Sequence, residues 1–285
     1  MSNKKHKVAI VTDGACSLSP SQGLEYGVHV VPVYVNFNDK TYQAGVNLST
    51  AEFYRLLRAN KHLPSTSQPT AQDFIHTYTE LAKQADAIVT VVISKQMSAT
   101  LDSALAAKEK FLDVPVHVID SRSVSMGLGM IAIAAARAAA DGQDADQVVR
   151  VVNDLISKMN VIFTVDTLEY LHKGGRIGGA TAFLGSALSI KPILYVKDGR
   201  IEPLEKQRTR RRAINRILEL MEERVGTSEV HASILHCEID NVAQELGAQI
   251  KSHFRCAEEV PIVDAGPVIG THAGPGTLGL VFYTQ

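Results

Sequence analysis

The sequence predicts an α/β protein of two domains, and three observations lead to this fold class. The chain has 285 residues, while single domains cluster at roughly 100 to 150. In its first half, short apolar stretches alternate with helical patterns, which is typical of a parallel sheet with helical crossovers. Its second half contains a two-residue hairpin signal, which indicates antiparallel pairing. We expect an N-terminal α/β domain over residues 1–160, with helices flanking a parallel sheet, and a C-terminal α+β domain over residues 161–285 with a mixed or antiparallel sheet.

The N-terminal half begins with a β-branched strand over 8–12, and the first helix is expected to start at Ser19. This serine is followed by Pro20 and Gln22, which are a first-turn proline and a capping-box residue. The later elements follow the strand and helix periodicities. We expect a strand over 28–37, a helix opening at 49–52, a polar loop over 63–69, a helix over 70–84, a strand over 87–94, a helix over 98–112, a strand over 116–120 and a helix over 124–140.

The C-terminal half follows an amphipathic helix over 144–159, and the domain boundary is placed near Asn160. The dipeptide Asp198-Gly199 is a hairpin signal between two strand-like stretches. The expected elements are strands over 192–197 and 200–204, a helix over 211–224, a strand over 230–236, a helix over 241–254, and strands over 260–263 and 278–283.

Composition and charge exclude several classes of protein. A formal net charge of -1 gives no overall attraction to nucleic acid or to anionic membranes. Three cysteines without CxxC spacing indicate neither a disulfide framework nor a zinc knuckle, and they favour a reducing cytoplasm. The apolar stretch after the basic segment 1–7 is too short for a signal peptide. The longest apolar run, 126–136, is shorter than the roughly 20 residues that cross a bilayer, so we expect a buried helix.

Stretches rich in hydroxyl side chains or glycine stand at several expected loop positions. Ligands collect at the carboxyl ends of parallel strands, so chemistry is expected in the loops after Val11, Ile93 and Ile119. A single hydroxyl residue in a loop caps a helix more often than it binds a ligand, so the set carries more weight than any member. The stretches are 12–14, 65–69, 94–100, 174–179 and 271–276.

Together these stretches resemble the DegV family of bacterial fatty-acid-binding proteins, across essentially the whole chain. The most specific pieces are the stretch 171–178 and the final His272-Ala273-Gly274-Pro275-Gly276. The matching motifs, in chain order, also include Val11-Thr12-Asp13, Thr66-Ser67-Gln68-Pro69, Ser98 with Thr100, 167–170, Lys191-Pro192-Ile193-Leu194, Asp198-Gly199 and Lys206-Gln207-Arg208-Thr209-Arg210.

The resemblance implies that a long-chain fatty acid lies in a tunnel between the two domains. It implies that Thr66 and Ser98 hold the carboxylate. Ser67, next to Thr66 in the same loop, is also expected to be a ligand-binding residue. The resemblance also places Arg176 and His272 close to the carboxyl end. No cofactor and no metal is expected besides this ligand, and His236, next to Cys237, is interpreted as a strand residue rather than a metal ligand.

The resemblance further implies a protein partner, a fatty acid kinase that docks at Arg208. The kinase phosphorylates the bound carboxyl group from ATP, so this chain is expected to be a carrier without catalytic residues of its own. Arg208 stands in a cluster with Arg210, Arg211 and Arg212, and positive charge at a helix start opposes the helix dipole. This placement favours an outside partner. A transient contact with a membrane surface stays open, and nucleic acid is not an expected partner.

A stand-alone hydrolase is the alternative function. In that hypothesis Ser98 or Ser94 is the nucleophile and His272 the base, acting on a lipid or acyl ester. The sequence contains no GxSxG elbow, HExxH or P-loop motif, so the carrier is the preferred hypothesis. A serine and a histidine in hydrogen-bond contact, with a carboxylate orienting the histidine, would favour the hydrolase instead.

Overall fold

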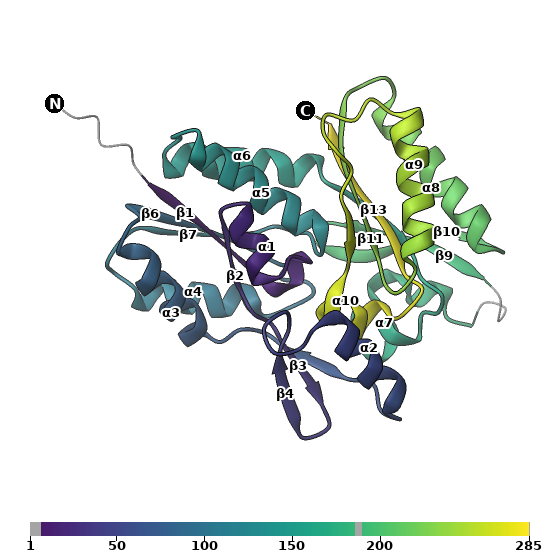
Figure 1. Ribbon diagram of the computed structural model, residues 1–285, viewed down its shortest axis with the longest axis horizontal. Helices are drawn as coiled ribbons and strands as arrows, with labels where there is room; N and C mark the ends of the chain where they lie inside the picture. The colour runs from purple at the N-terminus through teal and green to yellow at the C-terminus, as the bar shows by residue number, and fades with distance from the viewer. Residues whose placement is uncertain (1–6, 186–189, 285) are drawn as a thin grey trace.

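The computed structural model describes residues 7–185 and 190–284, and its strands form three sheets within these residues. Of the basic N-terminal segment 1–7, only Lys7 lies within the described residues. Figure 1 shows two halves side by side, the N-terminal one in purple to teal and the C-terminal one in green and yellow. The small third sheet projects below the junction between them. The expected α/β class with one parallel and one largely antiparallel sheet is confirmed.

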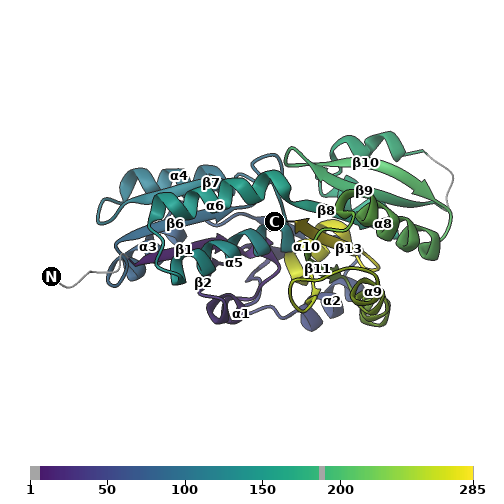
Figure 2. The same cartoon turned by 90° about the horizontal axis from the view of Figure 1, so that it is seen from above.

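The parallel sheet forms the N-terminal half and is covered by helices on both faces. Strand β6 is buried throughout, with Val89 and Val91 in the central core and Ile88 and Val92 in a second cluster beneath α3 and α4. A strand buried on both faces is apolar at successive positions, as this sequence is. Helices α5 and α6 lie on the other face (Figure 2). The strands, in spatial order, are β2 (Val28–Val31), β1 (Val8–Asp13), β6 (Ala87–Val92) and β7 (Val116–Asp120), and the helices are α1 (Pro20–Glu25), α3 (Ala71–Ala82), α4 (Thr100–Lys110), α5 (Met126–Ala140) and α6 (Ala145–Lys158).

The mixed sheet forms the C-terminal half. Its neighbouring strands are antiparallel except for the parallel pair β11 and β12. Helices α8 (Arg210–Val225) and α9 (Asp240–His253) bury one face, and the other face joins the same central core as α5. The core is therefore continuous between the two halves. The strands, in spatial order, are β10 (Arg200–Gln207), β9 (Lys191–Lys197), β8 (Asn160–Thr164), β13 (Leu278–Thr284), β11 (Val230–His236) and β12 (Ile262–Asp264).

The small sheet reaches from the N-terminal half to the C-terminal half. It consists of β4 (Lys40–Gln43), β3 (Tyr34–Phe37) and β5 (Ser65–Ser67), and α2 (Thr50–Ala59) follows β4. Both α2 and this sheet pack against α10 (Gly266–Ala273), a helix of the C-terminal half. Figure 1 shows α10 next to α2 at the junction. The N-terminal half thus supplies one wall around α10.

Several segments differ from the expected elements, which also did not include β4 or α7 (Glu169–Lys173). The stretch 28–37 is two strands of different sheets, because Pro32 lies between them and has no N–H for a ladder. The expected loop 63–69 contains β5, which pairs with β3. A strand, β8, begins at the expected domain boundary, and helix α10 occupies residues for which only a loop was expected. The division at residue 160 stays a prediction.

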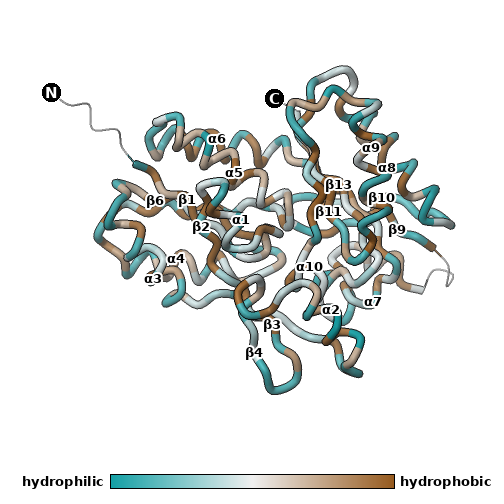
Figure 3. Tube along the Cα trace, in the orientation of Figure 1, coloured by the Kyte–Doolittle hydropathy of each residue, from teal (hydrophilic) through white to brown (hydrophobic). Residues whose placement is uncertain are grey.

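The hydropathy of the chain follows this arrangement. Central strands such as β11 and β13 are brown in Figure 3, while α8 and α9 carry teal on their outer sides. The expected buried apolar helix is confirmed as α5, most of whose side chains are inaccessible. None of the helices described for residues 7–185 and 190–284 has the length and apolar character that a membrane span requires.

Candidate functional site

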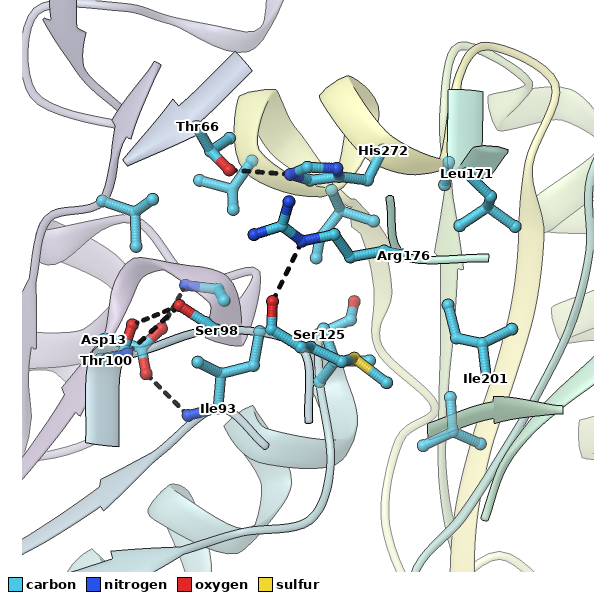
Figure 4. Close-up of a pocket in the computed structure, with 18 of the residues that line it drawn as sticks. Asp13, Thr66, Ile93, Ser98, Thr100, Ser125, Leu171, Arg176, Ile201 and His272 are labelled. Atoms are coloured by element: carbon cyan, nitrogen blue, oxygen red, sulfur yellow. Dashed lines mark hydrogen bonds between the residues drawn. The ribbon is translucent and has the colours of Figure 1, made fainter. Parts of the chain in front are cut away.

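A cavity of about 880 Å³, measured out to its open mouth, lies between the two halves. Most lining side chains are aliphatic or aromatic and come from both halves, and the polar ones gather on one side (Figure 4). Leu171 and Ile201 lie across the cavity from Asp13 and Ser98. The apolar wall includes Val33, Ile93, Met97, Val124, Val161, Phe163, Leu171, Ile201, Leu235, Val268 and Ile269.

Thr66 of β5 and His272 of α10 form a polar pair at the cavity. Alternation along β5 turns Thr66 toward the cavity, and His272 lies in the last turn of α10. The Thr66 Oγ1 and His272 Nε2 atoms are 2.7 Å apart, and the contact joins the two halves. With the ring proton on Nε2, the histidine donates to Thr66, and the threonine hydroxyl is free to donate to a ligand.

The other ring nitrogen of His272 is buried. Among the described residues Nδ1 has no hydrogen-bond partner, and it faces Gly174. A Cβ atom added at Gly174 would lie 2.5 Å from Nδ1, so only glycine allows the ring to sit here. Burial, and to a smaller extent the positive charge of Arg176, lower the pKa of His272 to about 4. The ring is therefore neutral at pH 7.

This shifted pKa predicts a measurable pH dependence of stability. Between about pH 6.5 and pH 4 the unfolded chain binds a proton at His272 that the folded protein excludes, so stability falls as the pH falls. The loss over the whole window is on the order of 3 kcal/mol. We expect the advantage of the wild type over His272→Gln to shrink accordingly when urea unfolding of lipid-free protein is compared at pH 7.5, 5.5 and 4.5. Parallel pH curves would contradict the assignment.

Arg176 follows α7 (Glu169–Lys173) and reaches across to the N-terminal half. Its Nε donates to the carbonyl oxygen of Met97 at 3.1 Å, and its Nη1 donates to the carbonyl oxygen of Gly174 at 2.8 Å. These bonds fix the guanidinium group beside His272 on the polar side (Figure 4). A fixed, half-buried cation at this place favours an anionic ligand group.

Ser98 lies on the loop between β6 and α4, close to Thr100. The two hydroxyl oxygens are 2.8 Å apart, and the Thr100 backbone amide donates to Ser98 Oγ at 3.3 Å. Both side chains line the cavity. The carboxylate of Asp13 lies behind them and accepts hydrogen bonds from the amides of Ala15 and Ile93. Burial raises the pKa of Asp13 to about 6, although both amides oppose this shift.

The structure brings Thr66, Ser98, Arg176 and His272 together at the cavity. Ser67 is different. It occupies the opposite face of β5, is exposed, and accepts a hydrogen bond from the side chain of Asn36 at 3.0 Å. Successive residues of a strand point to opposite faces, so the neighbour of inward-facing Thr66 points outward. The sequence analysis expected a loop here instead of β5, and a loop does not predict this alternation.

Some lining residues were not singled out in the sequence. Gln68 and Ser125 line the cavity, and Ser125 Oγ lies 2.7 Å from Ser17 Oγ. Ser125 follows β7, where the rule for parallel sheets already predicted chemistry. Gln68 belongs to the quoted motif next to Thr66. The rule and the motif could have found both, but neither says which side chain of a loop points inward.

The arrangement does not form a hydrolytic triad. His272 contacts Thr66 rather than a serine, Ser98 contacts Thr100, and Ser94 donates to a backbone carbonyl. No carboxylate orients His272 among the described residues. Within residues 7–185 and 190–284, no three His, Cys, Asp or Glu side chains lie close enough together to bind a metal ion.

Arg208 lies away from the cavity, between β10 and α8. It is exposed, as are Arg211 and Arg212, and within the described residues none of these three has an ion-pair partner. Arg210 instead pairs with Asp166 at 2.6 Å. Thr209 caps α8, so the three free arginines surround the positive end of a helix.

Known proteins resemble this chain over its whole length. A family model described as "Uncharacterised protein, DegV family" matches residues 7–285. A DegV domain-containing protein of Halalkalibacterium halodurans is 38% identical over 281 residues, which is 98% of this chain and 99% of that protein.

Solved structures show the same likeness in three dimensions. One, described as fatty acid binding of a DegV family protein from Thermus thermophilus, matches with a TM-score of 0.92 at 33% identity, over 98% of this chain and 100% of that chain. Another, a stearic-acid-binding protein from Eubacterium ventriosum, matches with a TM-score of 0.89 at 26% identity, over 97% of this chain and 98% of that chain.

Proposed function

The chain belongs to the DegV family, and from this premise we propose that it is a carrier that binds a long-chain fatty acid in the cavity between its two halves. The layout of the cavity carries the proposal: its walls are apolar, while its hydroxyl, imidazole and guanidinium groups lie on one side. A fatty acid has the same division into an apolar tail and one charged end. A DegV family protein from Thermus thermophilus is described as binding a fatty acid, and a similar protein from Eubacterium ventriosum as binding stearic acid.

Burial of the tail supplies most of the affinity in this proposal. At roughly 0.8 kcal/mol per methylene, a tail of about 14 methylenes gains on the order of 11 kcal/mol, from which the entropy cost of association is subtracted. The polar groups mainly orient the acid. A carboxylate that leaves water needs donors, and in this proposal the donors are Thr66, Ser98 and Arg176, which line the cavity.

Extraction of the purified protein tests the proposal most directly. Denatured protein is extracted with organic solvent, and the extract is analysed by mass spectrometry. We expect a fatty acid in near-stoichiometric amount. Lipid-free protein should then take up palmitic acid. A protein that neither contains nor binds a fatty acid would overturn the proposal.

We further propose that the carrier presents the carboxyl group to a fatty acid kinase, and that the partner supplies ATP. A docking surface is supported by Arg208, Arg211 and Arg212, three cations at the positive end of α8 that form no ion pair with any other residue within 7–185 and 190–284. An acidic surface on a partner would offset this unfavourable placement.

The docking proposal predicts separate effects on partner and lipid. Arg208→Ala should raise the carrier concentration that gives half-maximal acyl-phosphate formation by roughly tenfold at low salt, and less at high salt. Palmitate affinity should not change, because Arg208 lies outside the cavity. Arg150→Ala is a matched control, since Arg150 is an exposed arginine on α6 in the other half. Loss of lipid binding in Arg208→Ala would instead connect this arginine to the cavity.

A further inference from the structure

The turn of the β9–β10 hairpin touches the loop that carries Ser98. Asp198 and Gly199 have φ values of 49° and 81°, the two left-handed residues of a tight hairpin turn. The carbonyl oxygen of Gly199 accepts a hydrogen bond from Ser94 Oγ at 2.7 Å. A Cβ atom added at Gly199 would lie 2.3 Å from that same Oγ atom. The contact joins the mixed sheet to the end of β6 in the parallel sheet.

Ser94 organises the segment 94–98 around itself. Its hydroxyl oxygen accepts from the Gln96 amide at 3.1 Å, and its carbonyl oxygen accepts from the amides of Met97 and Ser98 at 2.9 and 3.2 Å. Its own amide donates to the carbonyl oxygen of Ser123 at 2.9 Å. The side chain is fully buried. The position of Ser98 is therefore set largely by Ser94.

A second bond from the C-terminal half reaches the same segment. Arg176 donates to the carbonyl oxygen of Met97, the residue immediately before Ser98. The segment 94–98 is thus held from the C-terminal half at two places, at Ser94 by the hairpin turn and at Met97 by Arg176 (Figure 4 shows the second bond). A shift of the hairpin turn must move Ser94, and with it the turn that ends at Ser98.

We infer that Gly199 is a positioning residue for the carboxyl end of the ligand, acting through Ser94 on Ser98. This inference rests on the proposed function, because it needs a carboxylate at Ser98. Glycine is required at residue 199 for two reasons, the left-handed backbone and the close approach of Ser94. Through the hairpin turn, the position of the carboxyl group depends on how the C-terminal half packs against the N-terminal half.

Carbon-13 NMR of bound [1-¹³C]palmitic acid tests this inference, because the carboxyl signal responds to the hydrogen bonds made by the carboxyl group. We expect Gly199→Ala and Ser94→Ala to move or broaden the signal beyond the wild-type linewidth, with palmitate affinity changed less than about threefold, since tail burial dominates. Gly142→Ala is the matched control: its φ is +85°, and a Cβ there would meet nothing within 4 Å. This control reports the cost of left-handed backbone alone, and its signal should be that of the wild type.

A double variant shows whether Gly199 acts through Ser94. Removing the Ser94 hydroxyl relieves the 2.3 Å collision, since the next nearest atom, Ser94 Cβ, is 3.3 Å away. The double variant should therefore lose less Tm than Gly199→Ala alone. Its remaining loss should be about as large as that of Gly142→Ala. If Gly199→Ala does not fold, Ser94→Ala alone carries the NMR test. Folded, palmitate-bound variants with the wild-type carboxyl signal would overturn the inference, whereas a wild type that binds no palmitate overturns the proposed function instead.

Discussion

Replacing Ile201 by tryptophan is expected to weaken palmitate binding at least about 100-fold while the protein stays folded. Ile201 lies on β10 and points into the cavity across from the polar side (Figure 4). A larger side chain here extends into space that the tail would occupy. Excluding about four methylenes, at roughly 0.8 kcal/mol each, costs about 3 kcal/mol of binding free energy, which is more than a factor of 100.

The measurement is displacement of a fluorescent fatty acid by palmitic acid, with Tm followed by circular dichroism. Ile201→Val is the matched control, because it keeps an aliphatic side chain at the same place and should bind almost as well as the wild type. Undiminished affinity in the folded tryptophan variant would mean that the tail does not pass this wall.

The second large effect is expected at the polar side, from the double variant Thr66→Val and Ser98→Ala. Valine keeps the shape of threonine, so this variant removes two hydroxyls with little change in packing. Each charge-assisted bond is worth about 1.5 to 3 kcal/mol. Affinity should fall, yet the tail should still hold the acid. Transfer to the carboxyl group should fall further, because displacement of a reacting group by about 1 Å can cost about 100-fold.

Two assays on the same variant separate these effects: palmitate affinity, and the rate of acyl-phosphate formation with a fatty acid kinase at saturating carrier. Ser67→Ala is the control, since it removes a neighbouring hydroxyl of the same strand that points away from the cavity. An unchanged transfer rate in the double variant would show that these hydroxyls do not position the carboxyl group.

The sequence predicted most of the elements because local signals were strong. Ser19 and Gln22 form the expected capping box at α1, and Asp198-Gly199 forms the expected hairpin. Strand β5, which was missed, lacks such a signal. It is three residues long and exists through its pairing with β3, which is separated from it by α2. A pairing partner far along the chain cannot be read from periodicity.

The motifs named several residues that line the cavity, but they did not predict how these residues are arranged. The motifs named Thr66 and His272 separately, but their contact depends on α10 packing against the small sheet. Ser67 was grouped with Thr66 because a sequence motif does not say which of its side chains point toward the cavity. The role inferred for Gly199 depends on an approach between residues 94 and 199, which only the packing of the two halves determines.

Because the core is continuous between the halves, a bound fatty acid should raise the stability of the folded protein and, through it, the amount of carrier in the cell. Apolar side chains from both halves meet around the cavity, so in the proposed function a bound acid completes the interior. A ligand that binds only the folded state adds about 2.7 kcal/mol of stability at a free concentration 100 times its Kd. Differences of 1 to 2 kcal/mol are enough to change the abundance of a protein several-fold through chaperones and proteases. Empty carrier is therefore the form that proteolysis removes first, and we expect its cellular level to follow the supply of fatty acid without any change in gene expression.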